Sequence, residues 1–134
     1  MNQAERRIWL IDALLNARPD GRGIAVPAGA GGQRDLLRAL MNVRSPEALA
    51  TGVLDIQDAY LQQRLVERGG ATDAGTLPYC NRIAVWRGDI TLLKADAIVN
   101  AANSQMLGCF VPGHHCIDNA IHTYAGMQLR LTCA

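Results

Sequence analysis

The side chains that bind soft metals are concentrated in one short stretch of this sequence. GCFVPGHHCIDNAIHTYAG, residues 108–126, contains two of the four cysteines and all three histidines of the chain. Zinc in proteins prefers Cys thiolate and His imidazole, with four ligands in structural sites and three plus an open position in catalytic sites. Cys109, His114 and Cys116, spaced C-x4-H-x-C, are therefore candidate zinc ligands from a single loop.

Alternatives to this ligand set stay open on spacing alone. His115, His122 or a distant cysteine could add a fourth ligand, but neighbouring side chains seldom reach one ion, and His122 falls on an expected helix. We favour three ligands and an open position. C-x4-H-x-C is not a standard zinc-finger spacing, so core cysteines beside a surface histidine pair explain the pattern about equally well. Cys80 and Cys133 stand apart and are expected to be core or surface thiols.

Polar residues flank the Cys/His loop on both sides. Asn100 and Asn103 follow an apolar run that predicts a buried strand, and the carboxyl ends of strands in α/β sheets are where ligands bind. Their amides could hydrogen-bond sugar hydroxyls, although an asparagine after a strand more often makes a turn. Asp118 could simply cap the last helix. Asp89, in Gly88-Asp89, could be only a turn residue.

The first half of the sequence predicts helices. Apolar residues recur at helical spacing over 4–17 and over 33–43. A third helix is predicted to start at Ser45-Pro46-Glu47, which resembles a cap followed by proline, and to end at Gly69-Gly70. The glycine-rich residues 21–32 lack the spacing of a phosphate-binding loop and are interpreted as a connector.

The second half predicts an α/β pattern. Short strands are expected at 83–86 and within 95–103, where Ala97, Ile98 and Val99 form an apolar run, and a helix is expected over 118–131. The fold class is thus α/β, with a helical region at 1–71 and a strand-turn-strand-loop-helix region at 72–134.

Composition limits the possible functions. The 134 residues suffice for one modest domain, and 49% are apolar. The 13 basic and 12 acidic residues give no signature of a nucleic-acid or anionic-membrane partner. No run approaches the roughly 20 apolar residues that span a bilayer, and no signal peptide is evident. We therefore expect a cytoplasmic protein with reduced thiols and without nucleic-acid or membrane partners.

Several segments together resemble the macrodomain family. WRGDIT (86–91) and DAIVNAANS (96–104) are similar to motifs of macrodomains generally. LGCFVPGHHCIDNAIHTYAGMQLR (107–130) resembles the loop of the zinc-dependent microbial branch. RALMNVRSP and DIQDAYLQQRL are similar to the helical N-terminal extension of that branch, so the resemblance covers 36–130. It implies the first strands and helix of a three-layer α/β/α macrodomain after a helical extension.

The resemblance also implies roles for individual residues. Asp89, with the backbone of Ile90, corresponds to the group that receives the adenine amino group of ADP-ribose, and Asn103 to the amide that holds the distal ribose. Ile117 and Asp118 correspond to positions lining the distal ribose and phosphate. The resemblance selects Cys109, His114 and Cys116 as the ligands of Zn²⁺.

The activity implied by the resemblance is hydrolysis of mono-ADP-ribose from protein side chains, with Asn103 orienting the sugar and Asp118 polarising a water or hydroxyl. The implied partners are ADP-ribose and a mono-ADP-ribosylated protein, for example a lipoyl carrier related to the glycine-cleavage H protein. An ADP-ribose reader without catalysis and a structural zinc or redox module are the alternatives.

The sequence ends at LRLTCA, where a macrodomain would continue with further strands and a glycine-rich diphosphate loop. We therefore expect an incomplete macrodomain that folds poorly and is inactive by itself.

Overall fold

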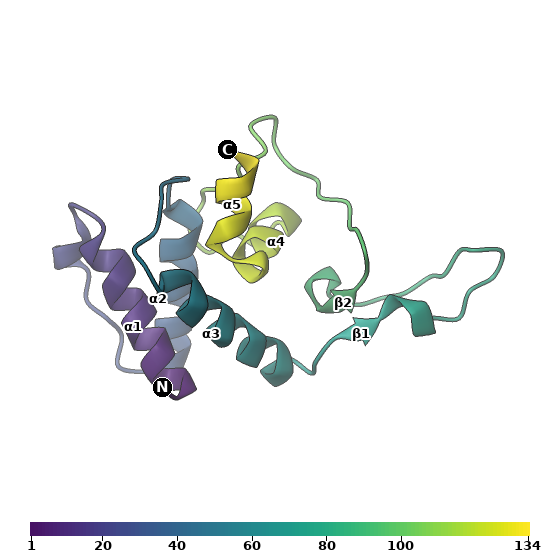
Figure 1. The fold of residues 1–134 in the computed structure, drawn as a ribbon, viewed down its shortest axis with the longest axis horizontal. Coiled ribbons are helices and arrows are strands. Elements are labelled where there is room, and N and C mark those ends of the chain that lie inside the picture. The colour runs from purple at the N-terminus through teal and green to yellow at the C-terminus, as the bar shows by residue number, and fades with distance from the viewer.

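The computed structural model describes residues 1–134, which form five α-helices, three 3₁₀ turns and one two-stranded sheet (Figure 1). The protein is thus mainly helical with a small β component. In chain order the elements are α1 (Gln3–Asn16), η1 (Gly21–Gly23), α2 (Ala30–Val43), α3 (Val53–Glu67), β1 (Thr72–Asp73), η2 (Ala74–Thr76), η3 (Ile90–Leu92), β2 (Leu93–Lys94), α4 (Ile117–Ala125) and α5 (Met127–Cys133).

The first two helices confirm the sequence prediction, with small shifts at their ends. Helix α1 starts with a capping box, in which the Asn2 side chain accepts from the Glu5 amide at 3.0 Å and the Asn2 amide donates to the Glu5 carboxylate at 2.9 Å. Helix α2 begins at Ala30 and so includes two glycines that were assigned to the connector. Both helices turn an apolar face inward.

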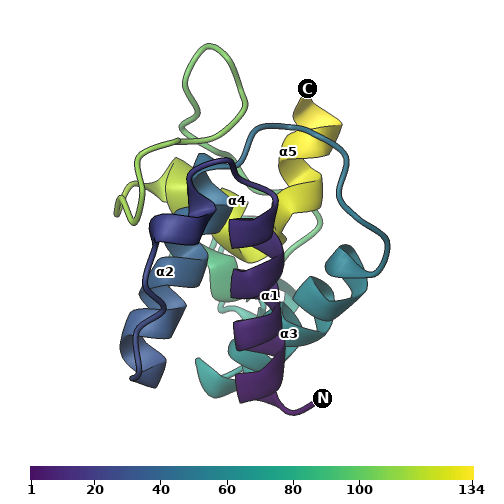
Figure 2. The ribbon, with the colours of Figure 1, turned by 90° about the vertical axis from the view of Figure 1, so that its left-hand side faces the viewer.

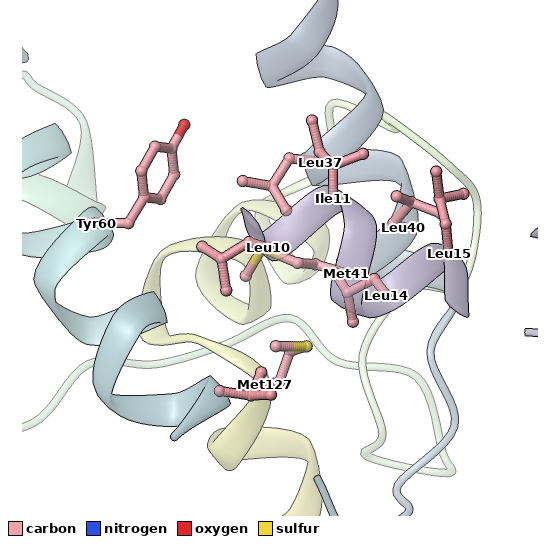
Figure 3. Packing of buried hydrophobic residues seen from close by; sticks show 10 residues of the cluster. Leu10, Ile11, Leu14, Leu15, Leu37, Leu40, Met41, Tyr60 and Met127 are labelled. Atoms are coloured by element: carbon pink, nitrogen blue, oxygen red, sulfur yellow. The ribbon is translucent and has the colours of Figure 1, made fainter. Parts of the chain in front are cut away.

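The hydrophobic core lies between α1, α2 and α3, and α5 closes it (Figure 3). Leu10 and Ile11 of α1 are fully buried at its centre. Met127, at the start of α5, is the one member of the cluster from the second half of the chain. The ten buried residues of this cluster are Leu10, Ile11, Leu14, Leu15, Leu37, Leu40, Met41, Val53, Tyr60 and Met127.

The predicted start of the third helix at Ser45 is wrong. Residues 44–52 form a loop, and α3 begins at Val53 after Gly52, whose φ of 83° is left-handed. The Arg44 guanidinium donates to the carbonyls of Glu47 and Ala48, each at 2.9 Å. In a helix these carbonyls would accept backbone amides, whereas here they accept the Arg44 side chain and the backbone stays in a loop.

The predicted strands at 83–86 and within 95–103 are also wrong. Ile83 is 70% exposed and forms only an isolated bridge with Cys80, Val99 is 89% exposed, and neither segment forms a strand. The sheet is instead the parallel pair β1–β2, with Thr72 opposite Leu93 and Asp73 opposite Lys94. A strand needs a neighbour for its backbone hydrogen bonds and apolar face. Figure 1 shows the segment between η2 and η3, which contains residues 83–86, extending away from the helices.

The predicted last helix exists but is broken at Gly126. This residue has φ 86° and ψ 170°, so α4 ends at Ala125 and α5 starts at Met127. The fully buried Gln57 of α3 accepts the Met127 amide through Oε1 at 2.8 Å, replacing an intrahelical bond at the break. The break therefore directs Met127 into the core.

The regions 1–71 and 72–134 contact each other through helices. Helix α4 packs on α2, behind it in the view of Figure 2. Asn42 of α2 donates to the Thr123 hydroxyl of α4 at 3.0 Å, and both residues are buried. The division at residue 71 stays a prediction. None of the helices has the length and apolar character needed to cross a membrane.

Candidate functional site

The structure brings the three predicted metal ligands together. The ligating atoms of Cys109, His114 and Cys116 all lie within 4.8 Å of one another. Cys109 Sγ is 3.5 Å from His114 Nδ1. A tetrahedral ion with Zn–S of about 2.3 Å and Zn–N of about 2.0–2.1 Å places its ligands roughly 3.5–3.8 Å apart. The donor set and its spacing therefore fit Zn²⁺ with small side-chain movements. His115, His122, Cys80 and Cys133 are not in this group.

Local backbone geometry explains why the loop converges. Cys116 is the N-cap of α4, and its sulfur accepts the Asn119 amide at 3.4 Å. Gly108, with φ 84°, passes against the His122 ring so closely that a Cβ would lie 2.6 Å from Cγ. Only glycine fits this backbone conformation and this approach. Helix α4 therefore fixes both sides of the loop, one through Cys116 and the other through His122.

Asn103 lies just before this loop and is tied to it. Its Nδ2 donates to the Gly108 carbonyl at 3.1 Å, and its Oδ1 accepts the Gln105 amide at 3.0 Å. Asn103 is exposed, as expected for a residue that would meet a ligand. This contact places the Asn103 side-chain amide beside Gly108, the residue immediately before the candidate ligand Cys109.

Asp118 is 4% exposed and belongs to a buried polar cluster in α4. Its Oδ1 accepts from Asn100 Nδ2 at 2.8 Å and lies 3.7 Å from His122 Nε2, whereas Oδ2 accepts no hydrogen bond. Burial lowers the pKa of His122, and the opposing effect of Asp118 does not overcome it. His122 is therefore neutral at pH 7. The sequence pattern did not indicate this cluster, because Asn100 and His122 are far apart along the chain.

Asp89, immediately before η3, and Ile90, the first residue of η3, lie at a second place. Partial burial raises the pKa of Asp89, but hydrogen bonds from Thr91 and the charge of Arg68 outweigh it and lower the pKa. Arg68 pairs with Asp89 Oδ2 and stacks 3.7 Å above the Tyr124 ring. Ile90 lines a shallow, mostly apolar hollow of about 400 Å³ between η3–β2 and α4.

The structure thus places the predicted residues in two groups. Cys109, His114 and Cys116 lie together, with Ile117 and Asp118 next in sequence and Asn103 bonded to the loop. Asp89 and Ile90 form the other group, and the hydrogen bonds of the Asp89 side chain go to Arg68 and Thr91.

Sequence reasoning missed four polar residues that hold the loop, although all four lie within the segments that carry the resemblance. Most of their contacts join segments far apart in the sequence, so no local pattern indicates them. The four residues are Arg38 and Asn42 of α2, Asn119 of α4 and Arg130 of α5.

No protein-family model matches the chain. Among curated proteins, the chain is 51% identical over 138 residues to a Treponema medium protein named protein-ADP-ribose hydrolase, covering 100% of this chain and 53% of that protein. It is 44% identical over 128 residues to a Staphylococcus aureus protein of the same name, covering 94% of this chain and 47% of that one. A Fusarium oxysporum protein named probable bifunctional ADP-ribose hydrolase/ADP-ribosyltransferase is 55% identical over 73 residues, covering 52% of this chain and 11% of that protein.

The chain spans about half the length of the first two curated relatives. Both of them are named for the activity that the sequence motifs imply. Along nearly its whole length, the chain is therefore similar to part of proteins named protein-ADP-ribose hydrolase.

Proposed function

We propose that this chain carries the metal-binding part of a zinc-dependent macrodomain hydrolase that removes mono-ADP-ribose from protein side chains. The observation that carries the proposal is the convergence of Cys109, His114 and Cys116 within 4.8 Å, directly before Asp118. The names of relatives at 44–51% identity support the same reaction class.

Two thiolates and one imidazole would hold Zn²⁺ and leave a coordination position for a ligand oxygen. The bound ion would act as a Lewis acid that lowers the pKa of a coordinated water or hydroxyl. Cys109 and Cys116 lie on either side of His114 in the loop. Cys116 is further held at the start of α4, which keeps its sulfur fixed relative to Asp118.

Asp118 is the candidate proton acceptor of the site. Its Oδ1 is held by Asn100, and its Oδ2 is left without a partner from the chain. An oriented carboxylate with one free oxygen can polarise a water or a ribose hydroxyl. Ile117, which starts α4 and is 38% exposed, and Asn103, which donates to the Gly108 carbonyl, would contact the distal ribose.

Asp89 and Ile90 would receive the adenine end of the ligand. The lowered pKa of Asp89 keeps its carboxylate charged at neutral pH, so it can accept from an adenine amino group. The apolar hollow lined by Ile90, Ile121 and Tyr124 offers a surface for a flat base. Arg68 occupies one oxygen of Asp89, and the adenine amino group would share or replace that contact.

The fixed position of Asp118 favours a second candidate, an ADP-ribose reader that does not cleave. A carboxylate anchored by Asn100 can hold a ribose hydroxyl in place without transferring a proton. Binding of ADP-ribose together with release from a mono-ADP-ribosylated protein supports the hydrolase, whereas binding without release supports the reader.

The test measures zinc content, ADP-ribose affinity and ADP-ribose release in the same preparation, using a mono-ADP-ribosylated lipoyl carrier protein as substrate. We expect about one zinc per chain, lost in Cys109→Ser and kept in the matched control Cys80→Ser, an exposed free thiol. Asp89→Ala should weaken ADP-ribose binding while Asp12→Ala should not. A wild-type chain without zinc would overturn the metal assignment, and one that also fails to bind ADP-ribose would overturn the proposal.

A further inference from the structure

Helix α2 reaches across the structure and holds the Cys/His loop. Arg38 donates through Nη2 to the His114 carbonyl at 3.0 Å and to Asn119 Oδ1 at 2.8 Å. Its Nε donates to the same Asn119 oxygen at 3.2 Å. One guanidinium therefore binds both the backbone of a candidate ligand and a side chain of α4, across 76 and 81 residues of sequence.

Asn119 links Arg38 to the rest of the loop through its own hydrogen bonds. It is fully buried, and its Nδ2 donates to the Val111 carbonyl at 3.1 Å and to the Cys109 carbonyl at 3.5 Å. Its backbone amide donates to Cys116 Sγ at 3.4 Å. Because Arg38 can only donate, it requires the amide oxygen of Asn119 to face it, and this leaves Nδ2 directed at the loop. The loop is thus held from Cys109 to Cys116.

A second contact from α2 supports the same loop at its turn. Asn42, one helical turn after Arg38, accepts the Gly113 amide at 3.1 Å through Oδ1. Gly113 has φ 63°, so the backbone turns sharply immediately before His114. Asn42 is 1% exposed and also donates to Thr123 of α4. Two residues of α2 therefore hold the backbone on both sides of His114.

We infer that Arg38, acting through Asn119, is a positioning residue that preorganises Cys109, His114 and Cys116 for a metal ion. The inference rests on the proposed metal site and deepens it. Partners outside the ligand sphere orient ligands, and removing such a partner typically lowers metal affinity about 10–100-fold. A helix more than 60 residues earlier in the chain is thus part of the metal-binding apparatus.

The experiment measures zinc affinity of the full chain by competition with a chromophoric chelator. Arg38→Ala should lose about 10–100-fold in affinity. Arg38→Lys should recover part of it, because an ammonium cannot reproduce the forked contact. The matched control is Arg34→Ala, one turn earlier on α2, where the exposed side chain makes no hydrogen bond. Arg34→Ala should bind zinc like the wild type.

A second control separates positioning from general stability. Val53→Ala removes core volume in α3, away from the loop, and should lower the melting temperature of the metal-free chain without changing zinc affinity. The Co²⁺ derivative adds a spectroscopic readout, because Arg38→Ala should alter the thiolate charge-transfer bands while Val53→Ala should leave them unchanged.

The outcomes distinguish this inference from the proposed function. Wild-type zinc binding with equal affinities in Arg38→Ala and Arg34→Ala would overturn the inference and leave the metal site standing. Equal losses in Arg38→Ala and Val53→Ala would reduce Arg38 to a structural role and overturn it as well. A wild-type chain that binds no zinc would overturn both together.

Discussion

Residues 1–60, which contain α1, α2 and the first half of α3, differ sharply in burial from the segment 61–107. The core cluster draws nine of its ten residues from the first 60 positions. No residue from 61 to 107 is buried, although this stretch includes Ile83, Val85, Ile98 and Val99. The two regions are similarly rich in aliphatic side chains, so composition does not explain the difference.

Hydrogen bonding does explain it. A helix satisfies its backbone within itself, and an amphipathic one then needs only a face to pack against. A strand must borrow its hydrogen bonds from a neighbour. In the segment 61–107 such pairing is limited to two residues on each side of β1–β2 and one isolated bridge, Cys80 with Ile83. Apolar residues without paired strands stay at the surface.

The strongest test of this contrast compares the shortening of one apolar side chain to alanine in each region. Leu10→Ala should lower the free energy of unfolding by about 2–5 kcal/mol, because it leaves a cavity at the centre of the core. Val85→Ala, at a side chain that is 91% exposed, should change it by no more than about 0.5 kcal/mol. Urea denaturation measures both. A large effect at Val85 would mean that the segment packs in solution.

The loop between the segment 61–107 and α4 is tested next. Gly108→Ala should cost about 1–2 kcal/mol for its left-handed backbone and about 1–3 kcal/mol more for the clash with His122. Gly113→Ala is the matched control, since its φ is also positive but no atom lies within 4 Å of the added Cβ. Gly113→Ala should lower the free energy of unfolding only by the cost of the left-handed backbone. Equal melting temperatures for the two variants would contradict the close approach of Gly108 to His122.

Arg68, at the end of α3, pairs with Asp89 of the segment 61–107 and stacks on Tyr124 of α4. An ion pair at the surface contributes about 0–1 kcal/mol, so Arg68→Ala should barely change global stability. It should instead release residues 72–94 and increase their cleavage by a protease severalfold. Arg64→Ala, which removes a pair within the same region of α3, is the control. Unchanged cleavage of Arg68→Ala would show that other contacts hold the segment.

The smallest expected effect is a pH dependence from His122. Burial lowers its pKa in the folded chain, so in mildly acidic solution the unfolded chain binds the proton that the folded chain excludes. Its contribution to stability is present above the unfolded value of about 6.5 and is lost as the pH falls below it. His122→Gln should flatten the decline of the urea midpoint between pH 7.5 and 5.5, measured with a chelator present. The exposed His115→Gln should not flatten it. Equal slopes in the wild type and both variants would refute the contribution of His122.

The sequence predicted helices better than strands for the reason given above. The periodicity of 4–17 and 33–43 located α1 and α2, because each helix is specified by its own residues. The start of α3 was missed, since the carbonyl contacts of Arg44 cannot be read from a local pattern. The break at Gly126 was missed because it depends on Gln57, about 70 residues earlier.

The candidate site shows the same division. Spacing within one loop identified Cys109, His114 and Cys116, which the structure places together. The supporting contacts of Arg38, Asn42 and Asn119 join segments far apart in sequence, so no local pattern reveals them. The burial of Asp118 with Asn100 and His122 likewise depends on the three-dimensional fold and could not be predicted from the local sequence.

Arg130 has a consequence for the order of folding. Its guanidinium donates to the carbonyls of Asn42 at 2.8 Å and Arg44 at 2.6 Å, at the end of α2, and to the Leu107 carbonyl at 2.6 Å. The contact with Asn42 closes a span of 88 residues. Helices α1 and α2 form through contacts between residues close in sequence and should fold fast. Closing a span of this length costs chain entropy and is slower. We therefore expect docking of α5, and with it the final shape of the Cys/His loop, to be the late kinetic step, completed only after residue 130 has left the ribosome.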